Sequence, residues 1–83
     1  MPSSLQLVSE QFPHLRERVA CLFEREEIFR ELCEDYEACT QALVRLESNA
    51  GLKREYSALR LRLETELLGY LRRDAQSPVH RPQ

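Results

Sequence analysis

Two apolar stripes with coiled-coil spacing, separated by a short polar segment, are the feature that most constrains the fold of this chain. Within residues 29–46 and again within residues 52–70, apolar residues recur in steps of three and four, which places them on one face of an α-helix. The pattern predicts two amphipathic helices, over residues 26–48 and 52–73. The stripe residues are Phe29, Leu32, Tyr36, Cys39, Leu43 and Leu46, followed by Leu52, Tyr56, Leu59, Leu63, Leu67 and Tyr70.

The segment between the stripes, ESNAG, predicts a reversal of the chain. Asn49 and Gly51 are residue types that accept the left-handed backbone angles found at helix ends, so we expect the first helix to stop near Ser48. Two helices of this length with so short a connection pack antiparallel to each other. The predicted fold class is therefore all-α, with an antiparallel, coiled-coil-like helical hairpin at its centre.

A turn at residues 50 and 51 also predicts which residues of the two stripes face each other. It places Tyr36 opposite Glu66, where the phenol can donate a hydrogen bond to the carboxylate. The expected apolar pairs are Leu46 with Tyr56, Leu43 with Leu59, Cys39 with Leu63, and Leu32 with Tyr70.

A separate apolar stripe lies in front of the hairpin, in residues 4–24, and a proline interrupts it. Proline is unfavourable inside a helix but favoured at its first position. We therefore expect a short helix that ends at Gln11, a break at Phe12 and a new helix from Pro13, against which Phe12 packs. The alternative is one long helix kinked at Pro13. The stripe residues are Leu5, Val8, Phe12, Leu15, Val19 and Leu22.

The length of 83 residues allows one small domain, which we place at residues 1–73. The hairpin stripe does not continue the front stripe in frame, so we expect a bend or a helix restart at residues 24–27. The last segment, residues 74–83 (DAQSPVHRPQ), contains two prolines and few apolar residues. We expect it to be a disordered tail.

Charged residues are segregated along the chain, with an acidic run in residues 24–37 and a basic excess in residues 53–73. In a hairpin these charges flank the apolar stripes and favour the antiparallel register; alternatively they dock a partner of opposite charge. The arginines that could contact phosphates are Arg60, Arg62, Arg72 and Arg73. Because the neighbouring acids oppose their field and the net charge is −2, nucleic acid is not the expected partner.

The sequence contains no pattern typical of catalysis or of metal binding. Cys21, Cys33 and Cys39 lack the spacing of a zinc site, and their odd number does not suit a disulfide framework. A helical hairpin offers no pocket for a substrate, and no phosphate-binding glycine loop is present. We expect a protein that is not an enzyme and has no cofactor. The sequence has no apolar run long enough to span a bilayer, and it does not begin with a pattern typical of a secretory signal. The expected location is therefore the cytoplasm.

Four segments carry a resemblance to a known family. They are FPHL at residues 12–15, IFRELCEDYE at 28–37, RLE at 45–47 and the leucine-rich stretch at 52–71. With these features the chain resembles the YdcH-like family, a group of small, mostly proteobacterial helical proteins of unknown function. The resemblance implies a helical hairpin and a cytoplasmic protein, and it implies no activity.

The pattern of amphipathic helices without a catalytic motif favours a function in protein–protein contacts. Because a lone two-helix hairpin is marginally stable, we expect self-association, a partner protein, or both. The leading hypothesis is a small adaptor or regulatory protein, and the alternatives are a self-assembling structural protein and a nucleic-acid accessory protein. The candidate interface residues lie on the front stripe or away from the hairpin stripes: Phe12, Leu15, Val19, Leu22, Leu61, Leu68 and Leu71.

Overall fold

The computed structural model describes residues 2–80, and the side chains of residues 2–73 within that range. The described chain is all-helical, as predicted, and contains no strand. It measures 53 × 26 × 22 Å. Its elements are α1 (Ser3–Gln11), the short 3-10 helix η1 (Pro13–Leu15), α2 (Arg16–Arg25), α3 (Glu27–Arg45) and α4 (Ala50–His80).

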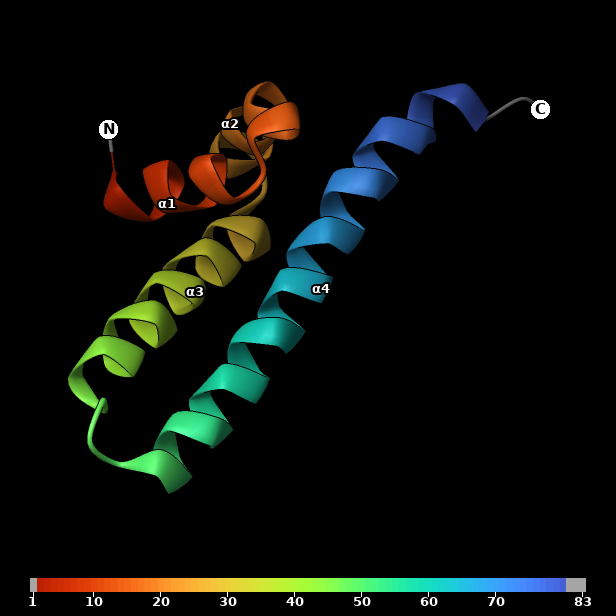
Figure 1. The fold of residues 1–83 in the computed structure, drawn as a ribbon. Helices are drawn as coiled ribbons and strands as arrows, with labels where there is room; N and C mark the ends of the chain where they lie inside the picture. Colours follow the sequence, from red (N-terminus) through yellow and green to blue (C-terminus); the bar gives the residue numbers. More distant parts are fainter. Residues whose placement is uncertain (1, 81–83) are drawn as a thin grey trace.

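The two longest helices organise the molecule. α3 and α4 lie side by side with opposite chain directions, joined by residues 46–49 (Figure 1). α1 packs on α3, and α2 packs on both α3 and α4. Because α1 and α2 lie near the start of α3, the end of α3 and α4 that carries the connecting turn extends beyond them (Figure 1). We call this the turn end.

The break in the front segment lies at Phe12, the position at which the sequence analysis places it. α1 ends at Gln11, and Phe12 leaves the helical angles with φ −124° and ψ 67°. Pro13 is the first residue of η1, where its missing N–H costs nothing. The alternative of one long helix kinked at Pro13 is wrong, because α2 begins only at Arg16 after a 3-10 turn.

The turn at residues 46–49 differs from the prediction in its mechanism. No residue of the described chain, glycines included, has a positive φ, so Asn49 and Gly51 do not supply left-handed angles. Asn49 instead caps the start of α4, because its side-chain oxygen accepts a hydrogen bond from the Leu52 N–H at 3.1 Å. α3 ends at Arg45 rather than near Ser48.

The earlier turn shifts the facing residues of α3 and α4. The Tyr36 hydroxyl donates a hydrogen bond to Glu64 at 2.6 Å, so the predicted pairing with Glu66 is wrong. The ring of Phe29 contacts the ring of Tyr70, with the ring centroids 6.0 Å apart. Because the turn is centred before residue 50, each position of α3 faces an earlier residue of α4.

All four α-helices contribute to one apolar core. The buried apolar residues are Val8, Val19, Leu22, Phe23, Phe29, Cys33, Tyr36, Cys39, Leu63, Leu67 and Leu71. Cys33 and Leu71 lie outside the predicted stripes, yet both are fully buried. The reason is that α1 and α2 add a second contact surface to the pair of long helices, so the buried face is wider than the two stripes alone predict.

Several predicted stripe residues are correspondingly less buried than expected. Leu52 and Leu59 are exposed, at 41% and 38% of their surface. Both belong to the turn end, beyond the reach of α1 and α2. The half-buried members of the stripes are Leu32, Leu43, Leu46, Tyr56 and Tyr70.

The backbone of α4 is helical to His80, which takes it into the segment predicted to be a disordered tail. Residues 81–83 and the side chains of residues 74–80 lie outside the described residues. The disorder predicted for residues 74–83 stays a prediction.

Candidate protein-interaction surfaces

The core already holds most of the residues that the sequence analysis places at an interface. Val19, Leu22 and Leu71 are buried by the chain's own helices. Phe12, Leu15 and Leu68 pack against the same core and are partly buried. Leu61 alone among the candidates is widely exposed, at 64% of its surface. In this arrangement the front segment contributes its apolar residues to the chain's own core.

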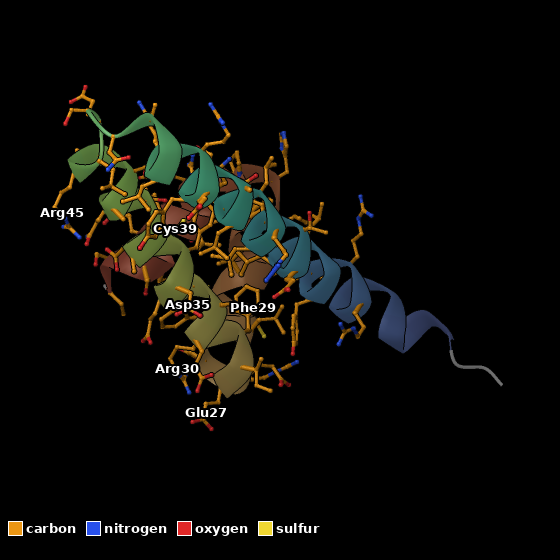
Figure 2. The ribbon with its side chains drawn as sticks, turned by 90° about the horizontal axis from the view of Figure 1, so that it is seen from below. Glu27, Phe29, Arg30, Asp35, Cys39 and Arg45 are labelled. Atoms are coloured by element: carbon orange, nitrogen blue, oxygen red, sulfur yellow. The ribbon has the colours of Figure 1, made fainter. Side chains whose placement is uncertain are left out.

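Arg30 connects the front segment to α3 at the junction between α2 and α3. Its Nη1 donates a 2.6 Å hydrogen bond to the Phe23 carbonyl oxygen, and its guanidinium lies 5.8 Å from the centroid of the Phe23 ring. Glu26, between the helices, has extended angles of φ −113° and ψ 111°. In Figure 2, Glu27 and Arg30 project outward from α3 while Phe29 lies toward α4. This contact holds the end of α2 against the start of α3.

A polar cluster at the interface of α3 and α4 is built around Tyr36. Besides the hydrogen bond to Glu64, the Tyr36 ring carries the Arg60 guanidinium 5.1 Å above its centroid. Burial raises the pKa of Tyr36 to about 12, and the hydrogen bond to Glu64 acts in the same direction. The phenol therefore stays protonated at neutral pH and acts as a fixed hydrogen-bond donor, which makes the cluster a structural link between the two helices.

The buried cysteines lack the properties of reactive thiols. Burial, with a smaller contribution from the Glu34 charge, raises the pKa of Cys33 to about 12. Burial also raises the pKa of Cys39, whose Sγ lies 3.1 Å from the Tyr56 carbonyl oxygen. Both side chains are thus thiols at neutral pH, and the thiolate is the form that attacks or binds metals. Within the part of the chain that the structure describes, no cluster of three His, Cys, Asp or Glu side chains could hold a metal ion.

The turn end carries the exposed apolar residues Val44, Leu52 and Leu59, together with two surface hollows. One hollow, about 350 Å³, is lined by Leu52, Glu55, Tyr56 and Leu59 of α4; we call it the α4 surface. The other, about 330 Å³, lies between the two long helices and is lined by Thr40, Leu43, Val44, Glu47, Lys53 and Arg60; we call it the turn groove. Val44 is the most exposed large apolar residue described, at 71%.

Val44 is not predictable as a surface residue from the sequence, because it falls outside the heptad frame. It follows Leu43 directly, so it lies about 100° further around the helix and does not belong to the stripe. An isolated valine beside a stripe carries no signal of its own. Whether the Val44 side chain is covered or exposed depends on how far α1 and α2 reach along α3. The apolar spacing does not determine that reach.

Two of the four arginines considered for nucleic acid lie on aromatic rings of the chain itself. Arg60 covers Tyr36, and the Arg73 guanidinium lies 4.6 Å from the Tyr70 ring centroid. Arg62 and Arg72 are exposed. The four arginines therefore occupy different environments and do not share one uniformly exposed basic surface.

These features define a small all-helical protein with a closed core and an uncovered turn end. None of the helices within the described residues has the length and apolar character needed to cross a membrane. No protein-family model, curated protein sequence or solved structure shows a significant match to the chain.

Proposed function

We propose that this chain is a small adaptor or regulatory protein that acts through protein–protein contacts and performs no catalysis. The observation that carries the proposal is the α4 surface, where the exposed Leu52 and Leu59 flank the half-buried Tyr56 around a hollow. The coiled-coil-like hairpin of α3 and α4 is the rigid support of this surface, and the packed front segment leaves it open.

The chemistry of the α4 surface fits a helix of a partner protein. Leucines at spacing seven with a tyrosine between them form an apolar strip along α4, and a partner helix can lay its own apolar side chains into such a strip. Tyrosine is enriched among the residues that dominate binding energy, because it buries a large ring and keeps a polar tip. Glu55 lies at the edge, where a charged rim is usual.

The competing functions draw on other parts of the molecule. A purely structural self-assembling protein would use only contacts between copies, and a nucleic-acid accessory protein would use the exposed Arg62 and Arg72. The proposed relationship to the YdcH-like family, and the cytoplasmic location that it implies, is compatible with the adaptor and with the self-assembling protein.

A pull-down from native lysate at low and at high salt tests the proposal. We expect a stoichiometric protein partner that survives high salt, because the contact is apolar. Leu59→Asp should remove this partner, since a carboxylate would be buried in the apolar contact. Leu61→Asp is the matched control: it places the same charge on an exposed position two residues away, outside the α4 surface, and should keep the partner.

Two results would contradict the adaptor. Nucleic acid captured at low salt and lost at high salt would favour the accessory protein. Equal capture of the same partner by the Leu59→Asp and Leu61→Asp variants would show that the α4 surface is not the contact. Circular dichroism of both variants verifies that each keeps its helical fold.

A further inference from the structure

The turn groove combines an apolar floor with positive charge. Val44 stands exposed beside the half-buried Leu43, and Lys53 and Arg60 line the same hollow with Glu47 as the single acid. Lys53 is exposed, and Arg60 is half-buried with its guanidinium over the Tyr36 ring. A segment that fills this groove should therefore offer a small apolar side chain together with carboxylates.

Such a segment is present at the other end of α3. Ile28 is exposed at 58% of its surface, although it lies among acidic residues. Glu31 and Asp35 follow it at steps of three and four, which places all three side chains on one face of the helix. Both acids are exposed. We call Ile28, Glu31 and Asp35 the acidic face of α3.

We propose that the acidic face of one copy of this chain docks in the turn groove of a second copy. Ile28 would meet Val44 and Leu43 in the groove, and the carboxylates of Glu31 and Asp35 would lie near Lys53 and Arg60. The two surfaces match in the sign of their charge and in their exposed apolar residue, and electrostatic complementarity of this kind selects a partner and its orientation.

The geometry makes this contact head-to-tail. Ile28 and Val44 are 16 residues apart, about 24 Å along the helix and about 160° around it. One copy cannot close the contact on itself, because the two surfaces lie at opposite ends and on opposite sides of α3. Each contact between two copies then leaves one acidic face and one groove free. Contacts of this heterologous type build rings or open chains rather than closed two-fold dimers.

Because the head-to-tail contact uses a different surface on each copy, it can be tested by complementation between two variants. Ile28→Lys disables the acidic face, because it replaces the apolar residue with a cation that would face Lys53 and Arg60, and it leaves the groove intact. Val44→Asp disables the groove, because its carboxylate would face Glu31 and Asp35, and it leaves the acidic face intact. Both positions are exposed, so each variant should keep its fold, which circular dichroism verifies. In sedimentation velocity the wild type should form species larger than a dimer as its concentration rises. Each variant alone should stay a monomer, and an equimolar mixture should form a dimer and stop there.

The same measurement distinguishes the alternatives. A wild type that stays monomeric at every concentration would overturn the proposal and leave the groove to a different acidic partner. A mixture of the variants that stays monomeric would overturn it as well, because a two-fold contact or a contact elsewhere would then be responsible for assembly. Added salt should weaken the mixed dimer, since part of its attraction is electrostatic. None of these residues belongs to the α4 surface, so this result is independent of the adaptor test.

Discussion

Replacing Phe29 with alanine is expected to lower the free energy of unfolding by about 3–5 kcal/mol, the usual cost of removing a phenylalanine from a core. Phe29 is fully buried and is among the largest side chains with no exposed surface. Its ring contacts Tyr70 of α4 edge-on. Truncation would therefore open a cavity at the place where α3 and α4 meet. For a small domain this loss is a large part of the total stability.

The neighbouring Ile28 provides a matched control for this prediction. It sits one residue away in the same helical turn but is mostly exposed, so Ile28→Ala should change the stability by less than about 0.5 kcal/mol. Urea unfolding followed by circular dichroism, at low protein concentration, measures both variants. Similar small losses for both would mean that the start of α3 does not pack on α4 as described.

Leu71→Ala should destabilise the fold by about 2–5 kcal/mol, while Leu61→Ala should have almost no effect. In the sequence the two leucines look alike, since both lie off the hairpin stripe. In the structure Leu71 is fully buried, and Leu61 is one of the most exposed apolar residues. The difference arises because α2 packs on α4, as well as on α3, and widens its buried face.

Thermal unfolding of the two variants, side by side, measures this difference. A loss of 2 kcal/mol or more in a domain of this size lowers the midpoint by roughly 10 °C. Equal midpoints of thermal unfolding for the Leu71→Ala and Leu61→Ala variants would contradict the packing of α2 on α4.

The sequence predicts the helical class well because apolar spacing and helix breakers are local properties. The break at Phe12 and Pro13 follows from the missing N–H of proline, and no distant residue is needed to predict it. The spacing of the stripes similarly indicates the long helices, although α3 ends at Arg45, before the predicted Ser48.

The details of the turn and the register are not predictable from the same patterns. Asparagine is suitable both for the end of one helix and for the cap of the next, and Asn49 takes the second role. This choice moves the turn toward the start of the chain and pairs Tyr36 with Glu64 instead of Glu66. A stripe of leucines does not decide between neighbouring registers, since each of them buries similar side chains.

The location of the candidate surfaces depends on tertiary packing even more strongly than the turn and the register do. Val19 and Leu22 could cover the chain's own core or face a partner, and their spacing is the same in both cases. Their burial in the structure removes them from the candidate surface. The exposure of Val44, Leu52 and Leu59 results from the limited reach of α1 and α2, which is a property of the whole assembly of helices.

The front segment belongs to the same folded body as α3 and α4, because α1 and α2 pack their apolar residues into the shared core. Native-state hydrogen exchange of the backbone amides tests it directly. We predict that the amides of residues 20–23 in α2 are protected to within about tenfold of those of residues 33–39 in α3, because both open only with the shared core. Amides in α2 that exchange faster by several orders of magnitude would show that the front segment detaches, which would contradict a single folded body.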